Sequence, residues 1–477
     1  MISFEITNLS RYLLYTLILI LSSVKAYATH NRSGSITYRH LYGTTYEFKI
    51  TTCTKTSSDA DRPELEIFWG DGTSDTIPRE LPIDFNGTYD VQKNTYYGIH
   101  TYTGPDTYII RVEDPNRNAG VLNITNSVDK VFCIQTELVI SPFMGSPNNS
   151  VIIEDCPCPE FACANNIWCY NISAYDPDGD SLSYSLVPCK GEDCLDMAIP
   201  AVYEYPDQIA GGVMSIDPIT GTLCWDAPTL AGIYNIAILI REYRNGLYVG
   251  SVIQDMQFEV MGNCNNNPPV IQDVEDTCVF AGTNLDIAFE ANDSEHSVTV
   301  FATGAVFHLE DNPAVFDDST GSLEATGHFL WTPNCEQASD DYYSIVVHAE
   351  DSHEAIQLTD LSTFRIKVNI PPITGLTVNP IGNSMELSWN PSVCSDIDHY
   401  NIYRSIDSSD YESECCDKGT AEAMGYELIG TATDTNYSDN FNLVVGNRYC
   451  YLVTAVNSSG VESCVSCFID EVNHRFF

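Results

Sequence analysis

The chain has 477 residues, 44% of them hydrophobic, which is enough material for three or four domains that each bury a core. Its 66 Asp and Glu residues outnumber 21 Lys and Arg residues, and the formal net charge is -45. A surface this negative repels phosphate backbones and anionic lipid, so we expect no nucleic acid partner and no binding to a membrane surface.

The N-terminus has the pattern of a secretion signal. Arg11 precedes a 13-residue apolar run, Tyr12 to Val24, which is too short to span a bilayer. Ala26-Tyr27-Ala28 then offers a small-x-small cleavage site. We predict a signal peptide at residues 1–28, with an uncleaved anchor as the alternative, and no later transmembrane segment. The chain is therefore expected to be secreted or to lie at the cell surface.

Eighteen cysteines in an exported chain predict disulfides. Domain boundaries near residues 150, 267 and 370 leave an even number of cysteines in every part. If each domain is self-contained, the first and third parts hold one pair each. This reasoning predicts Cys53 bonded to Cys133 and Cys278 bonded to Cys335.

The other cysteines leave most pairings open. Cys189 and Cys194 could close a small surface loop. A zinc site is the alternative for four closely spaced cysteines, but the missing histidines favour disulfides. These four are Cys156, Cys158, Cys163 and Cys169. Cys464 and Cys467 have redox spacing, yet no helix is predicted around them, so we expect a structural role.

The first module, residues 29–150, carries a tight turn and a half-buried strand. Trp69-Gly70-Asp71-Gly72-Thr73 predicts a turn after a strand, and Tyr108, Ile110 and Val112 alternate as one buried face. With the preceding His100-Thr101-Tyr102, these stretches resemble the two ends of a polycystic-kidney-disease (PKD) repeat. The resemblance implies a β-sandwich in which the turn and the strand pack together.

The second module (residues 151–267) and the third (residues 268–370) repeat one pattern. An Asp-x-x-Thr-Gly-x-Leu element begins at Asp217 and again at Asp317, one hundred positions later. A spacing of this size indicates repeated domains. Both modules resemble cadherin-like or Ig-like domains of bacterial surface proteins.

The stretch Asp176-Pro177-Asp178-Gly179-Asp180 predicts a calcium site in the second module. Carboxylates two residues apart around a glycine can converge on one cation, and Glu242 after a later strand is a plausible fourth ligand. A polar hairpin turn without a metal is the alternative. In the third module one ligand is lost, so we expect weak calcium binding or none. The matching positions there are Asp293, Glu295, Ser297 and either Glu350 or Asp351.

The fourth module, residues 371–468, resembles a fibronectin type III domain. Trp389 and the alternating strand from Tyr449 to Asn457 match the core of that sandwich. It departs from the family by a cysteine-rich insertion at about 406–425, and a short tail, 469–477, follows it. The four modules together predict an all-β, disulfide-rich chain of tandem Ig-like β-sandwich domains in an elongated array.

Sequence motifs for catalysis are missing. His353-Glu354 begins like a zinc-protease helix, but Gln357 stands where the second histidine is needed. The chain has no Gly-x-Ser-x-Gly elbow and no phosphate-binding glycine loop. We therefore expect a protein that is not an enzyme.

The module order resembles the secreted, gliding-motility-associated multidomain surface proteins of Gram-negative bacteria. The stretches most like them begin at Thr29, Arg62, Glu113 and Asp176. The resemblance implies export by type IX secretion and a role in adhesion or surface assembly, with cell-surface proteins or polysaccharide as partners. The sequence departs from the family because it stops at Phe477 without the C-terminal sorting domain, which allows a periplasmic location.

Two alternatives to this function stay open. The first is a carbohydrate-binding protein or an accessory part of a secreted polysaccharide-degrading enzyme, because Tyr and Trp rings on sandwich faces can stack on sugars. The second is an enzyme whose catalytic domain follows the present C-terminus.

Overall fold

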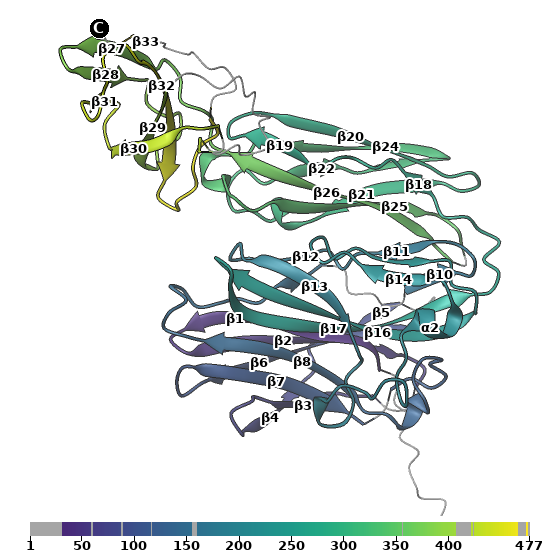
Figure 1. Cartoon of the computed structure of the whole chain (residues 1–477). Helices are drawn as coiled ribbons and strands as arrows, with labels where there is room; N and C mark the ends of the chain where they lie inside the picture. The colour runs from purple at the N-terminus through teal and green to yellow at the C-terminus, as the bar shows by residue number, and fades with distance from the viewer. Residues whose placement is uncertain are drawn as a thin grey trace, which may run out of the picture.

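The computed structural model describes most of the chain from residue 31 onward. The described residues are 31–58, 61–86, 89–115, 117–154, 160–354, 356–406, 421–422, 424–465 and 474–475. The predicted signal peptide, Cys156, Cys158, Cys467 and most of the cysteine-rich insertion lie outside these ranges. The described chain is built of β-strands in tandem sandwiches with several disulfides, which confirms the all-β fold class (Figure 1).

The first module contributes eight strands to one large sheet. They are β1 (Asn31–Tyr42), β2 (Thr45–Lys55), β3 (Glu64–Phe68), β4 (Ser74–Pro78), β5 (Asp84–Asn86), β6 (Val91–Thr101), β7 (Asp106–Asp114) and β8 (Phe132–Ile140). Tyr108, Ile110 and Val112 of β7 are buried as predicted. The indole ring of Trp69 stacks on the imidazole ring of His100, with centroids 4.7 Å apart. The turn after Trp69 therefore packs against the strand that contains His100.

The second module adds shorter strands and one long hairpin. They are β9 (Ile152–Ile153), β10 (Glu160–Cys163), β11 (Trp168–Tyr170), β12 (Ala174–Tyr175), β13 (Ser181–Val187), β14 (Val213–Ile216), β15 (Leu223–Asp226), β16 (Gly232–Arg244) and β17 (Leu247–Met261), with one short helix α2 (Pro206–Ala210). Its main core is formed by residues between Val151 and Val260, and a smaller cluster of its residues also includes Val121 and Ile124 of the first module. The first module likewise has a core of its own, between Ile36 and Ile140.

Strand β17 joins these two modules into one 12-stranded sheet. Besides its partner β16, it pairs with β8 at Gly250–Val252 and with β1 where Asp255 lies opposite Gly34. Ten consecutive residues of β17, Val249 to Phe258, are buried, so protein covers both faces of the strand. Residues on both sides of position 150 therefore share one sheet.

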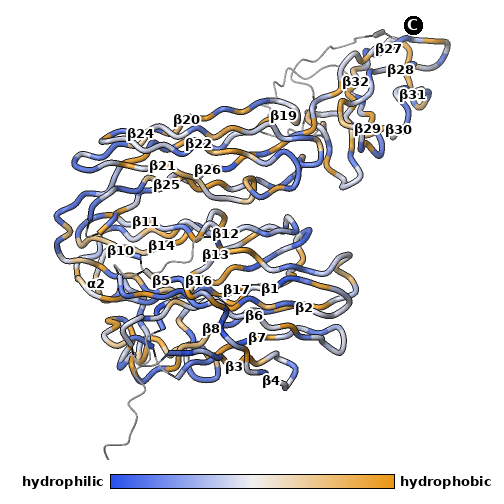
Figure 2. The backbone as a smooth tube through the Cα atoms, turned by 180° about the vertical axis from the view of Figure 1, so that it is seen from behind, coloured by the Kyte–Doolittle hydropathy of each residue, from blue (hydrophilic) through white to orange (hydrophobic). Residues whose placement is uncertain are grey.

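The third and fourth modules are sandwiches of two sheets each. The third comprises β18 (Val270–Ile271), β19 (Thr277–Phe280), β20 (Leu285–Asn292), β21 (Val298–Thr303), β22 (Val315–Asp317), β23 (Ser319–Gly321), β24 (Glu324–Trp331), β25 (Tyr343–Asp351) and β26 (Thr359–Asn369). The fourth comprises β27 (Thr377–Ile381), β28 (Ser384–Ser388), β29 (Ile397–Ile406), β30 (Glu427–Ala432), β31 (Asn436–Asp439), β32 (Arg448–Asn457) and β33 (His474–Arg475). Figure 2 shows apolar and polar stretches interleaved along these strands, as expected for sheets with one buried face.

The third module lies alongside the second, and the fourth projects from its far end (Figure 1). Polar contacts fix the first of these interfaces: Thr303 Oγ1 donates to Ser173 Oγ at 2.6 Å, and the Gly304 amide donates to Glu154 Oε2 at 2.9 Å. A small apolar cluster of the second and third modules lies around the Cys163–Cys264 disulfide.

The disulfides correct the predicted pairings. Cys133 is bonded to Cys194, and Cys335 is bonded to Cys394, so the predicted pairs Cys53–Cys133 and Cys278–Cys335 are wrong. Cys53 and Cys278 are each part of another disulfide. The prediction failed because it assumed that no disulfide crosses a module boundary, whereas both of these do.

The geometry explains each exchange of partner. Cys133 is the second residue of β8 and lies opposite Lys190 in an isolated bridge. This bridge brings the loop with Cys194 close, and the Cα atoms of Cys133 and Cys194 are 5.4 Å apart. The suggested Cys189–Cys194 loop is therefore also wrong, and Cys189 is a buried free thiol. At the other boundary, the Cα atoms of Cys335 and Cys394 are 5.6 Å apart.

Candidate functional site

The carboxylate turn of the second module folds as a compact loop between β12 and β13. Asp176 Oδ1 accepts hydrogen bonds from the amides of Asp178 (2.8 Å) and Asp180 (3.1 Å). Gly179 has φ +81°, a left-handed conformation that favours glycine. Ligand oxygens of Asp176, Asp178 and Asp180 lie within 4.8 Å of one another, so the predicted convergence of the three carboxylates is confirmed.

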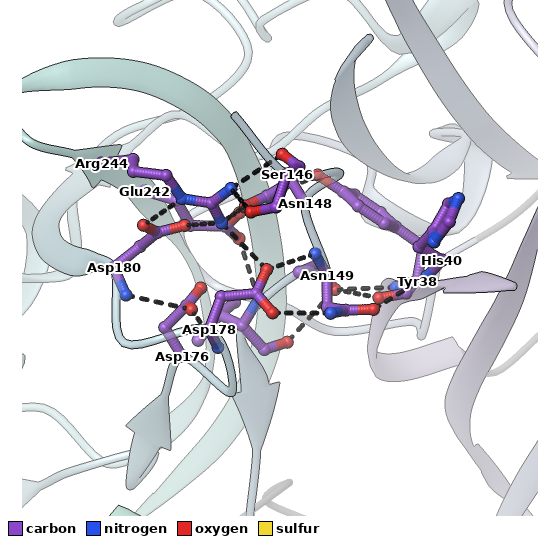
Figure 3. A network of polar contacts seen from close by, with 12 residues as sticks. Tyr38, His40, Ser146, Asn148, Asn149, Asp176, Asp178, Asp180, Glu242 and Arg244 are labelled. Atoms are coloured by element: carbon purple, nitrogen blue, oxygen red, sulfur yellow. Dashed lines mark hydrogen bonds and ion pairs between the residues drawn. The ribbon is translucent and has the colours of Figure 1, made fainter. Parts of the chain in front are cut away.

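Arg244, at the end of β16, binds two of these carboxylates (Figure 3). Its Nε and Nη2 atoms donate to the two oxygens of Asp180 at 2.8 and 2.7 Å, and Nη2 also lies 3.0 Å from Asp178 Oδ2. The guanidinium further donates to Ser146 and to Asn148 Oδ1. A residue of the protein thus supplies positive charge where a metal ion was predicted.

Asp178 connects the turn to the first module through Asn149. Its two oxygens accept from the Asn149 backbone amide at 2.7 Å and from Asn149 Nδ2 at 2.6 Å. Asn149 Oδ1 in turn accepts from the His40 amide of β1 at 2.8 Å. The turn therefore lies at the joint between the first and second modules, and its contacts hold the connecting segment against β1.

Glu242 belongs to β16, two residues before Arg244, and is completely buried. Its carboxylate accepts from the Val151 amide at 2.9 Å and from Asn148 Nδ2 at 2.7 Å. Glu242 does not belong to the group of three carboxylates whose ligand oxygens lie within 4.8 Å of one another. Burial, followed by the nearby Asp176 charge, raises its pKa to about 8.

Asp176 has one oxygen that is not satisfied. The buried Oδ2 atom has no hydrogen-bond partner, although Oδ1 has two. Burial is the main reason that the pKa of Asp176 rises to about 7, and the neighbouring Asp180 charge raises it further. The Oδ2 atom of Asp176 is therefore the atom at this turn that can still take up a proton or bind a cation.

Charge counting tests whether calcium fits. Arg244 pairs with two of the three converging carboxylates, and the buried Oδ2 atom of Asp176 lacks the hydrogen-bond partner that a buried polar atom normally has. Oxygen ligands of this kind suit calcium. Because Arg244 already binds both oxygens of Asp180 and one oxygen of Asp178, an ion held here would bind chiefly through Asp176 and would share the other two carboxylates with Arg244.

The corresponding turn of the third module has a different arrangement. Asp293 Oδ1 accepts from the amides of Glu295 and His296, both at 2.6 Å. Asp351 is occupied by Asn266 and by the amides of His353 and Leu358. Within the described residues, the turn of the second module is the one group of three or more clustered metal-ligating side chains.

Sequence reasoning missed Arg244, Asn148 and Asn149, which hold the site together. One signal was available: Arg244 comes two residues after Glu242, which the sequence already placed near the carboxylate turn. No local pattern singles out the asparagines, because their partners lie 29 or more residues away.

Comparisons with known proteins give no family assignment. No family model and no curated protein matches the chain. Among solved structures, a three-domain titin fragment has 13% identity and a TM-score of 0.20, and covers 66% of this chain and 96% of its own length. The FN1–FN3 domains of chicken CNTN1 have 11% identity and a TM-score of 0.18, with coverages of 68% and 98%. None of the described helices has the length and hydropathy needed to cross a membrane.

Proposed function

We propose that this chain is an exported, non-enzymatic modular protein that mediates adhesion or the assembly of a cell surface. The observation that carries the proposal is the joint between the first two modules. There β17 continues the sheet of the first module, and the acidic turn is used for contacts that hold the connecting segment. A firm joint suits a protein that presents a binding surface at a fixed geometry.

The disulfides support export. Four are formed among the described cysteines, and two of them connect different modules. Such bonds persist in oxidising compartments such as the periplasm and the cell exterior. The finer proposal, a link to gliding motility and type IX secretion, rests on the sequence resemblance alone.

Calcium at the joint is part of the proposal. Asp176, Asp178 and Asp180 would hold the ion, and it would supply positive charge to carboxylates that Arg244 neutralises only in part. Asn149 and Arg244 hold the turn against the first module both with and without the ion.

Retention on surfaces tests the proposed function. The purified chain is incubated with whole bacterial cells and with a panel of insoluble polysaccharides, in calcium and in chelator. An unrelated protein of similar negative charge serves as control. We expect retention on cells above that control; equal retention on every surface would overturn the adhesion proposal.

Location needs a separate test. The resemblance to Gram-negative surface proteins implies a cell with an outer membrane, and protease added to such intact cells degrades a surface protein and spares a periplasmic one. We expect degradation in intact cells, and protection until the outer membrane is opened would contradict a surface location.

A further inference from the structure

The outer face of the first module contains a pocket of about 640 Å³. Strands β1, β2 and β6 form its floor, and Ser150 at the module boundary forms part of its wall together with Ile152 and Ile153 of the second module. A volume of this size is typical of pockets that bind small molecules or short segments of a polymer. The joint described above fixes the wall relative to the floor.

The floor presents one row of cross-strand neighbours. Thr37 lies opposite Lys49, and Lys49 lies opposite Tyr97, so all three side chains leave the same face of the sheet. Their strand neighbours Ile36, Phe48, Ile50 and Tyr96 are buried in the core on the opposite face. The Tyr97 side chain is 42% exposed, so an aromatic ring is available beside a lysine.

The charge of the pocket contrasts with the charge of the chain. Three of its thirteen lining residues are cationic, Arg39, Lys49 and Lys93, whereas Lys and Arg account for only 21 of 477 residues overall. Arg39 is paired with Glu47 at 2.6 Å. Lys49 and Lys93 form no ion pair with any residue that the structure describes, although most other cations of this acidic protein do.

The floor is unsuited to binding a peptide by strand addition. Strand β2, at its centre, is hydrogen-bonded to β1 on one edge and to β6 on the other along its length. Its backbone groups are therefore occupied, and recognition depends on side chains. Hydroxyl groups of Thr37 and Thr51, an exposed tyrosine ring and two unpaired ammonium groups are suited to a sugar that carries a negative charge.

We propose that this pocket binds a short segment of an anionic polysaccharide, with Tyr97 stacked on a sugar ring and Lys49 and Lys93 on its carboxylate or sulfate groups. The proposal rests on the adhesion function above and names its ligand class. Glu80 also lines the pocket, and its carboxylate disfavours a polysaccharide with a negative charge on every sugar ring. It favours a polysaccharide in which only some of the rings carry an anionic group.

Calorimetric titration of the purified chain tests the proposal, in chelator so that calcium neither gels the sugar nor occupies the acidic turn. The probes are trigalacturonate, its neutral methyl ester and a short sulfated galactan. We expect at least one charged probe to bind, the methyl ester to bind at least tenfold more weakly, and affinity to fall with added salt. Which charged probe binds distinguishes a carboxylate ligand from a sulfate ligand.

Variants locate the binding. Lys49→Gln and Lys93→Gln should each weaken binding about tenfold, since each removes a charge-assisted hydrogen bond. Tyr97→Ala should also weaken binding, whereas Lys130→Gln, which lies outside the pocket, is the matched control and should not. Equal thermal melting of all four variants would show that folding is unchanged.

Any of these results would overturn the proposal: no binding of any charged probe, equal binding of the methyl ester, or unchanged affinity of the Lys49→Gln and Lys93→Gln variants. Tighter binding of an acidic peptide than of either charged sugar would also overturn it. If the sugars fail while the chain is still retained on cells, only the ligand assignment fails and the adhesion proposal stands.

Discussion

Arg117 and Asp255 form an ion pair that is buried from solvent, with side-chain exposures of 0% and 1%. The guanidinium donates through Nη1 and Nη2 to the two carboxylate oxygens at 2.9 and 2.6 Å, and Nη2 also donates to the Lys190 carbonyl. Asp255 belongs to β17 of the second module, and Arg117 follows β7 of the first. The pair therefore holds β17 in the sheet of the first module.

Removing one member of this ion pair should lower the stability of the folded protein strongly. Arg117→Leu leaves the buried Asp255 carboxylate without its cationic partner and with Asn235 Nδ2 as a remaining donor, so we expect the free energy of unfolding to fall by about 3–5 kcal/mol. Urea unfolding followed by tryptophan fluorescence measures the loss. The double variant with Asp255→Leu should recover part of it, because no charge then remains buried. The exposed Arg39–Glu47 pair is the control, and Arg39→Gln should change stability by less than about 1 kcal/mol. Equal effects of Arg117→Leu and Arg39→Gln would contradict this role.

Stability should fall as the pH rises from about 5 to about 8. The folded pKa values of Asp176 (about 7) and Glu242 (about 8) lie above the ordinary values of 3.8 and 4.5. In this range the folded protein therefore holds protons that the unfolded chain has released, and raising the pH removes that stabilisation. Thermal melting in chelator should show a Tm that decreases across the range. Glu242→Gln carries no charge and should flatten the decrease; a Tm that rises with pH in both proteins would refute the assignment.

The sequence predicted each module's core but not how the modules join. Alternation along β7 marks Tyr108, Ile110 and Val112 as buried because strand periodicity is a local property. The pairing of β17 with β8 and β1 connects residues more than 100 positions apart, as Asp255 and Gly34 show, and no local period encodes it. Gln254 and Asp255 are buried polar residues of β17. Polar residues inside a long, mostly apolar strand were the one feature of the sequence that indicated special partners on both faces.

The same distinction applies to the candidate site. The spacing of Asp176, Asp178 and Asp180 predicted their convergence, since three alternate residues of one turn must lie close together. Arg244 is 64 residues from Asp180, and its position depends on the β13–β16 pairing. Sequence reasoning therefore located the carboxylates and missed the residue that neutralises them.

Mass mapping of non-reduced peptides should find Cys133 joined to Cys194 and Cys335 joined to Cys394. The second bond connects the third and fourth modules across the linker that contains Pro371 and Pro372. Replacing both Cys335 and Cys394 by Ser should therefore speed limited proteolysis of that linker, because the bond no longer restricts separation of the modules. Removing the Cys169–Cys224 bond, which lies inside the second module, is the control and should leave linker cleavage unchanged. Peptides joining Cys53 to Cys133 would contradict the structure.

Calcium and Arg244 should act on the same carboxylates. Calcium that binds only the folded chain raises stability by about 2.7 kcal/mol at a concentration one hundred times its Kd, so we expect a higher Tm in calcium than in chelator. Asp176→Asn removes the unpartnered oxygen and should abolish this increase, whereas Asp293→Asn in the third module should not. Arg244→Gln should enlarge the increase, because the variant has no internal cation at Asp178 and Asp180. Equal Tm values in calcium and chelator, for both the unaltered chain and Arg244→Gln, would exclude a calcium site and leave Arg244 as the resident cation of the joint.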